Sequence, residues 1–170
     1  SKVMTSPKKP LMMIIGGAKI DDKVGMIENF QDKADYFLMG SSYIDLPSDL
    51  LKNPKVIMPI DWVSEDNKKL DIGPKTIEKY SEIISSAKTV IWNGPLGLFE
   101  YPQFRVGSEK IVYAIINSGA FSVVGGGETT QFISELGLEN KFSFVSTGGG
   151  AMLEFLSGKR LPALEALKVL

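Results

Sequence analysis

Short runs of apolar residues alternate with longer amphipathic segments along the chain. Six runs are nearly continuous and bounded by glycine, proline or polar residues, which predicts buried strands at 11–15, 36–39, 56–58, 89–92, 121–124 and 142–145. The intervening segments predict helices at 24–31, 45–52, 76–87, 104–117, 131–136 and 151–156. In the third of these helices, Ile77, Tyr80 and Ile84 fall on one face.

Strands that are apolar on both faces and separated by helices favour a parallel sheet covered on both sides. Right-handed crossovers then predict a three-layer, doubly wound α/β fold with a six-stranded, mostly parallel sheet, similar to a Rossmann fold. We expect residues 1–170 to form one domain, in which residues 1–10 are a helix remnant and a proline-punctuated entry. The polar stretch 64–76 is predicted to be the longest loop.

Glycine-rich segments follow several of the predicted strands. The most pronounced is VVGGGETT at 123–130, and similar junctions occur at 14–19, 91–97 and 145–151. Because the carboxyl ends of parallel strands meet at one edge of a sheet, we expect these loops to converge. Bare backbone N–H groups beside a helix start suit a phosphate. A glycine-rich turn that only reverses the chain is the alternative.

Two lysines and one glutamate flank these loops. Lys19 and Lys23 are four residues apart and share one helical face, where their ammonium groups could grip a polyphosphate. Two solvated lysines are the alternative. Glu128 could hold Mg²⁺ over the same phosphates, since hard oxygen ligands suit this cation. A carboxylate that is favoured only by the helix dipole is the alternative for Glu128.

Composition narrows the class of protein. With 44% hydrophobic and 23% charged residues and a net charge of −1, the chain resembles ordinary globular domains and has no basic balance for nucleic acid. No apolar run is long enough to cross a bilayer, so we expect no membrane partner. The absence of cysteine fits a cytoplasmic location. The absence of histidine removes Ser-His-Asp catalysis and histidine-ligated zinc, neither of which phosphoryl transfer needs.

Five ordered segments resemble one known family, although the P-loop and dinucleotide-binding fingerprints are both missing. IIGGAKIDDKVGMIEN, LDIGPKT, VIWNGPLGLFE, VVGGGETT and STGGGAMLEFLSGKRLP closely resemble the carboxy-terminal, nucleotide-binding half of phosphoglycerate kinase. That family transfers a phosphoryl group between 1,3-bisphosphoglycerate and ADP in glycolysis, giving 3-phosphoglycerate and MgATP. The resemblance therefore implies ADP or ATP, with Mg²⁺, as the ligands.

The resemblance also implies a set of site residues. The nucleotide would be lined by Gly16, Gly17, Ala18, Lys19, Lys23, Gly73, Asn93, Pro95, Leu98, Glu100, Gly125, Gly126, Gly127 and Thr129. Among these, Gly73 and Leu98 would border the adenine, and Glu100 would take the ribose hydroxyls.

The implied reaction centre is a smaller set. Lys23, Gly126 and Gly127 would be the catalytic group, and 147–150 would face the transferring phosphoryl group. Glu128 would be the metal ligand, at a position where the family usually has aspartate. A longer side chain there implies that the metal sits differently or is bound through water.

Other departures bear on activity. The half that binds 3-phosphoglycerate or 1,3-bisphosphoglycerate is absent, so we expect a monomeric domain fragment that binds nucleotide without turnover; a naturally shortened protein is the alternative. Where the family usually has a glycine run, Ser41 and Ser42 replace part of it. The helical segment that follows is longer in the family and is limited to 43–53 in this chain. A non-catalytic binding or scaffold module, or an unrelated α/β protein with structural glycines, are the other hypotheses.

Overall fold

The architecture is a parallel six-stranded sheet between two layers of helices, in a computed structural model that describes residues 7–17, 21–41 and 46–146. The strands are β1 (Leu11–Ile15), β2 (Tyr36–Met39), β3 (Val56–Ile57), β6 (Thr89–Asn93), β7 (Phe121–Gly125) and β8 (Phe144–Ser146). They lie in the order β3-β2-β1-β6-β7-β8, and every neighbouring pair is parallel. The predicted α/β fold is confirmed.

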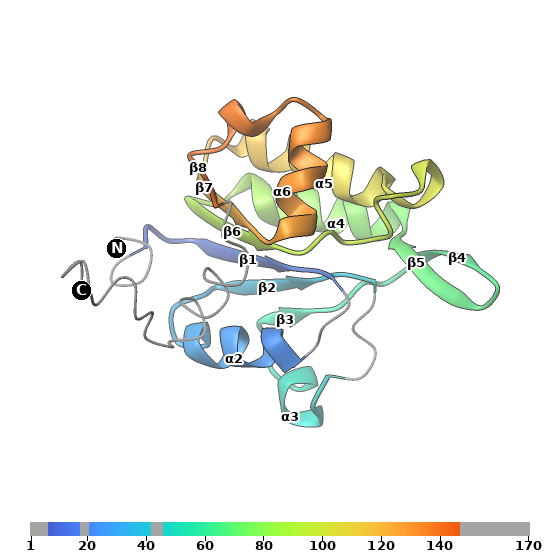
Figure 1. The fold of residues 1–170 in the computed structure, drawn as a ribbon. Helices are drawn as coiled ribbons and strands as arrows, with labels where there is room; N and C mark the ends of the chain where they lie inside the picture. The colour runs from blue at the N-terminus through green and yellow to red at the C-terminus, as the bar shows by residue number, and fades with distance from the viewer. Residues whose placement is uncertain (1–6, 18–20, 42–45, 147–170) are drawn as a thin grey trace, which may run out of the picture.

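Helices cover both faces of this sheet (Figure 1). On one face lie α4 (Pro74–Ser85), α5 (Val106–Ser118) and α6 (Gly127–Glu135), and on the other lie α2 (Asp21–Phe30) and the short α3 (Ser48–Leu51). Alternate residues of a strand point to opposite faces, so Met12 and Ile14 join the core under α4–α6 while Met13 and Ile15 join the core over α2. The sheet is therefore buried on both sides along β1.

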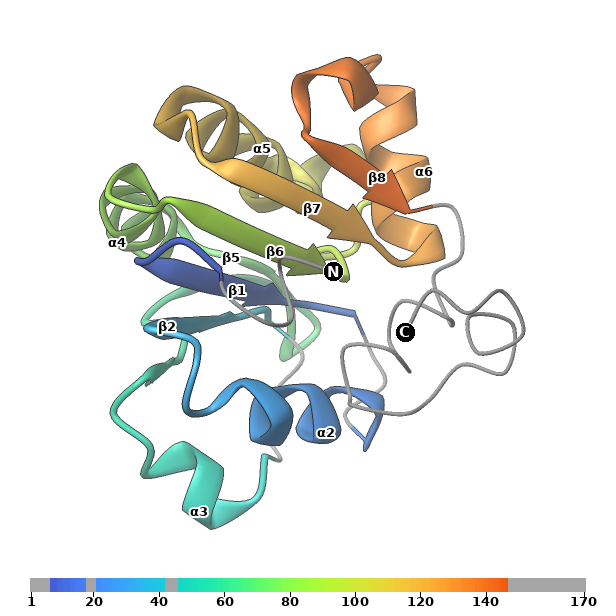
Figure 2. The ribbon, with the colours of Figure 1, turned by 90° about the vertical axis from the view of Figure 1, so that its left-hand side faces the viewer.

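The strand order reverses between β1 and β6. From β1 the chain runs outward through β2 and β3, and it then returns to β6 on the opposite side of β1. The helices that follow β1 and β6, α2 and α5, consequently lie on opposite faces of the sheet (Figure 2). In doubly wound sheets, ligands bind beyond the carboxyl ends of the strands at such a point.

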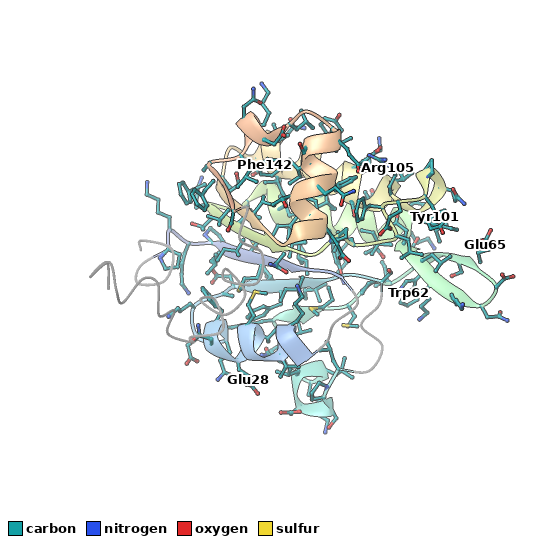
Figure 3. The ribbon with its side chains drawn as sticks, in the orientation of Figure 1. Glu28, Trp62, Glu65, Tyr101, Arg105 and Phe142 are labelled. Atoms are coloured by element: carbon teal, nitrogen blue, oxygen red, sulfur yellow. The ribbon has the colours of Figure 1, made fainter. Side chains whose placement is uncertain are left out.

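A two-stranded hairpin replaces the loop predicted at 64–76, so that prediction is wrong. β4 (Trp62–Glu65) and β5 (Lys68–Ile72) pair antiparallel, and Glu65 lies opposite Lys68. The two residues between them, Asp66 and Asn67, have φ of 49° and 61°, as a two-residue hairpin turn with left-handed backbone requires. Asp and Asn tolerate that conformation better than most residues. Figure 3 shows Trp62 and Glu65 on this projecting hairpin.

The sequence predicted where the helices lie better than it predicted the residues at which they begin and end. α6 begins at Gly127, four residues before the predicted start at 131, because Gly126 caps the helix with φ of 101° and two threonines continue it. The predicted closing helix at 151–156 lies outside the described residues. Two short 3₁₀ turns, at Pro102–Phe104 and Glu139–Lys141, complete the described chain. No helix in the described ranges is long and apolar enough to span a membrane.

Candidate functional site

Strand register brings the glycine-rich loops to one edge of the sheet. Met39 pairs with Ile15, Ile15 with Asn93, Asn93 with Gly125, and Gly125 with Ser146, so five strands end in one row. The segments that begin at 16, 40, 94 and 126 all leave the sheet from this row. The predicted convergence of these loops is therefore present, whereas the loop that follows Ser146 lies outside the described residues.

The loops after β1 and β6 are in direct backbone contact. The N–H groups of Gly16 and Gly17 donate to the carbonyl oxygens of Asn93 and Pro95, both at 2.9 Å. A Cβ atom placed on Gly16 would lie 2.0 Å from the Pro95 oxygen, and one placed on Gly94 would lie 2.0 Å from the Gly16 oxygen. Both positions therefore require glycine. These two glycines allow the loops to approach each other and do more than reverse the chain.

Lys23 reaches this junction from the first turn of α2. Its side chain is only 5% exposed, and its Nζ donates to Oδ1 of Asn93, whose residue exposure is 1%. The solvated-lysine alternative therefore does not hold for Lys23. Lys19 and Ala18 lie outside the described residues.

The amide nitrogen of Asn93 is the one buried side-chain polar atom within the described part of the chain that lacks a hydrogen-bond partner. A Cβ atom on Gly126 would lie 3.3 Å from this Nδ2 atom. The amide is thus held between Lys23 and the loop after β7. A buried donor without a partner costs about 1–3 kcal/mol, and a bound acceptor would remove that cost.

The loop after β7 supplies a helix N-terminus. Gly125 ends β7, Gly126 is the N-cap of α6, and Gly127 is exposed in its first turn. The first N–H groups of a helix have no intrahelical partner and carry a partial positive charge. Thr129 is fully buried, and its Oγ1 accepts a hydrogen bond of 2.7 Å from the Gly94 N–H. In this structure Thr129 fixes the neighbouring loop.

Glu128 places a carboxylate beside the same loops. It is exposed in the first turn of α6, and a Cβ atom on Gly17 would lie 3.6 Å from its Oε2 atom. The described residues hold no group of three or more acidic, histidine or cysteine side chains that could bind a metal ion. One carboxylate beside a helix N-terminus suits Mg²⁺ when phosphates are bound there, because Mg²⁺ is commonly held by one or two carboxylates together with substrate phosphates.

Gly73 and Leu98 lie by the hairpin. Gly73 is the N-cap of α4, and a Cβ atom on it would lie 2.4 Å from Cγ of Asp61. The Leu98 N–H donates to the Leu70 carbonyl at 2.8 Å. The side chain of Leu98 is 41% exposed, and Glu100 is exposed as well. The hairpin that the sequence did not predict therefore connects the two predicted adenine-side residues Gly73 and Leu98.

Two carboxylates that sequence reasoning missed support this region. Asp61 accepts hydrogen bonds from the N–H groups of Lys75 and Thr76 at the start of α4. Desolvation would raise the pKa of Asp61, but hydrogen bonds from Thr76 and Lys75 lower it below its usual value. Asp71 is fully buried, and this burial raises its pKa to about 6. An aspartate directly before Ile72-Gly73 in LDIGPKT was the available signal.

The described residues thus bring together groups that could bind an anion with an associated cation. Lys23, the N-terminus of α6 and the glycine backbone supply positive potential, and Glu128 supplies one carboxylate. Such groups can position and neutralise a polyphosphate without any proton-transferring side chain.

Comparison with known proteins places this arrangement in a family. The family described as phosphoglycerate kinase matches residues 1–45 and 41–159. Phosphoglycerate kinase of Dictyoglomus turgidum is 38% identical over 213 residues, covering 98% of this chain and 54% of the relative. The chain therefore spans about half the length of the curated relatives it matches. The two matched segments overlap at 41–45, within the region 41–53 where the sequence analysis found departures from the family.

Solved structures of the same family have the same fold as this chain. Phosphoglycerate kinase from Coxiella burnetii superposes with a TM-score of 0.85 at 30% identity, over 98% of this chain and 55% of that chain. The enzyme from Pyrococcus horikoshii superposes with a TM-score of 0.84 at 30% identity, over 99% and 54% of the two chains.

We expect Thr129→Val to destabilise the domain, because the buried Gly94 N–H loses its acceptor. The expected loss is about 1–3 kcal/mol in the free energy of unfolding, measured by urea titration. Thr130→Val is the matched control: its hydroxyl is partly exposed and contacts the Gly126 and Gly127 carbonyls, so its loss should stay within about 0.5 kcal/mol. Equal stabilities would show that the Thr129 hydroxyl does not hold this loop.

Proposed function

Because this chain belongs to the phosphoglycerate kinase family, we propose that it is the adenine-nucleotide-binding half of such a kinase, which binds ADP or ATP with Mg²⁺. The observation that carries the proposal is the buried contact between Lys23 and the Asn93 oxygen at the switch point, beside the Asn93 amide nitrogen that lacks a partner among the described residues. A phosphate oxygen placed there accepts from both side chains. The whole reaction, phosphoryl transfer between 1,3-bisphosphoglycerate and ADP, is part of the proposal.

The phosphate chain lies across three loops in this proposal. Gly16 and Gly17 let it approach the end of β1 closely, and Gly125, Gly126 and Gly127 lead it to the N-terminus of α6, where N–H groups and the helix dipole favour anions. Lys23 provides the full positive charge at the reacting end. Gly126 and Gly127 act with it as the catalytic group, through backbone N–H groups and the absence of side chains.

Glu128 would hold Mg²⁺, directly or through water. When bound with nucleotide, Mg²⁺ neutralises charge on the phosphates. The position of Glu128 beside Gly17 supports this role, because a cation there contacts phosphates that lie along the glycine loop. At the other end, Leu98 and Gly73 would border the adenine, Glu100 would bind the ribose hydroxyls, and Asn93 and Pro95 would lie between the two ends.

A non-catalytic nucleotide-binding module with the same fold is the second candidate. Both candidates bind nucleotide, and they differ in turnover.

We expect the chain alone to bind MgADP and MgATP but not to turn over, because an acceptor substrate must be held and enclosed opposite the nucleotide for transfer. Titration calorimetry measures the binding, and a coupled assay measures ATP consumption that depends on 3-phosphoglycerate. Robust consumption by the chain alone would refute the expected inactivity. Absence of nucleotide binding would refute the proposed function itself.

We expect Lys23→Met to weaken ADP binding through the lost charge. Charge-assisted contacts contribute about 1.5–3 kcal/mol, so affinity should fall by roughly ten- to a hundredfold. The variant also leaves Oδ1 of Asn93 unpaired, so melting must be measured first and both proteins titrated well below their transitions. Lys110→Met, on the exposed side of α5, is the matched control and should bind ADP normally. Equal ADP affinity for Lys23→Met and wild type would remove Lys23 from the phosphate site.

We expect Glu128→Gln to fold normally and bind metal-free nucleotide about as well as wild type, but to gain much less affinity from added Mg²⁺. Glu128→Asp, the usual family residue, should restore the gain. Glu135→Gln near the end of the same helix is the matched control. Nucleotide titrations with and without Mg²⁺ measure the difference.

A structural role for Glu128 gives a different result. If the carboxylate only complements the helix dipole, Glu128→Gln lowers stability by about 0.3–1 kcal/mol and leaves the Mg²⁺ dependence of nucleotide binding unchanged. Identical Mg²⁺ dependence in the variant and the wild type would therefore exclude the metal role.

A further inference from the structure

Asp71 is a fully buried carboxylate that joins the hairpin to α5. Its Oδ2 accepts the N–H of Gly107 at 2.7 Å, in the first turn of α5, and its Oδ1 accepts the N–H of Ile72 at 2.8 Å. The two backbone donors belong to segments more than thirty residues apart in sequence. The carboxylate therefore connects the end of β5 to the start of the helix that follows the β6 loop.

Two glycines enclose this carboxylate. A Cβ atom placed on Gly97 would lie 2.3 Å from Oδ1 of Asp71, and one placed on Gly107 would lie 2.4 Å from the same atom. The position on Gly97 is also only 2.5 Å from the Phe104 carbonyl oxygen. A side chain at either glycine would displace the carboxylate or the backbone around it.

The residues on each side of Gly97 are held as well. The Leu96 N–H donates to Oγ of Ser108 on α5 at 2.9 Å, and the Leu98 N–H donates to the Leu70 carbonyl on β5 at 2.8 Å. Asp71 lies between these two bonds and against Gly97. The segment 96–98 is therefore fixed to both α5 and β5, and it presents the Leu98 side chain to solvent.

From this geometry we propose that Asp71 is a positioning residue, whose buried carboxylate holds the segment 96–98 in place for the adenosine end of the bound nucleotide. The inference rests on the proposed function. It concerns a residue that acts on the ligand through Leu98 and does not contact it.

The charge state of Asp71 sets the pH at which the inference is tested. Burial raises the pKa of this carboxyl to about 6, against the hydrogen bonds from Gly107 and Ile72 that lower it, and repulsion from Glu109 on α5 adds to the rise. Glu109 itself is paired with Arg105 at 2.8 Å. Well above pH 6 the carboxyl is therefore ionised and accepts the Gly107 N–H as a charged group.

The experiment measures binding of each end of the nucleotide with its own probe: adenosine for one end, inorganic pyrophosphate for the other, and ADP for both. The titrations are made at about pH 7.5, where Asp71 is ionised. For Asp71→Asn we expect roughly tenfold weaker binding of adenosine and ADP, and pyrophosphate binding within about twofold of wild type. Asp35→Asn is the matched control: Asp35 also accepts a backbone N–H, from Leu11 at 2.7 Å, but at the opposite end of the sheet. It should leave all three affinities unchanged.

Wild-type affinities for ADP and adenosine in Asp71→Asn would overturn the inference alone. An equal loss of adenosine and pyrophosphate binding would also overturn it, because that is the pattern of a general structural defect. Absence of ADP binding by the wild-type chain would overturn the proposed function and this inference together.

Discussion

The contact between Gly16 and Gly94 is the constraint on which the site depends. Each backbone occupies the space that a side chain of the other would need, so the loops after β1 and β6 can approach only as glycines. This approach lets Gly17 bond to Pro95, and the Trp92 indole N–H fixes the Gly94 carbonyl at 2.8 Å from the other side. Thr129 then ties the loop after β7 to the same point. Three loops are thereby held as one rigid surface.

Asn93 places a buried polar side chain at the point where these loops meet. Its oxygen is occupied by Lys23 and its nitrogen is left without a partner among the described residues, so the amide is half satisfied in the absence of ligand. Burial of such groups without full pairing is uncommon in protein interiors and tends to mark functional positions. The same register that ends β6 at Asn93 places this amide level with Ile15 and Gly125.

Much of the fold could be predicted from the sequence, because the central parallel strands are apolar on both faces and segments with helical periodicity separate them. The hairpin was missed because its strands are largely polar and partly exposed, and only Asp66-Asn67 signalled the turn. The start of α6 was misplaced because a glycine run usually indicates a loop, although Gly126 here caps a helix. The burial of Lys23 could not be predicted, since it depends on a partner 70 residues away.

The row that ends the strands also has a consequence for how the domain folds. Ile15, Asn93 and Gly125 come from distant parts of the chain, and each pairing closes a long loop before it gains stabilising contacts. Parallel sheets with such non-local pairings fold slowly. No single segment of the chain contains more than a fraction of the candidate binding surface, so that surface exists only after the whole sheet has assembled. Ligand binding would then report completed folding of the entire domain, and shorter fragments would lack it.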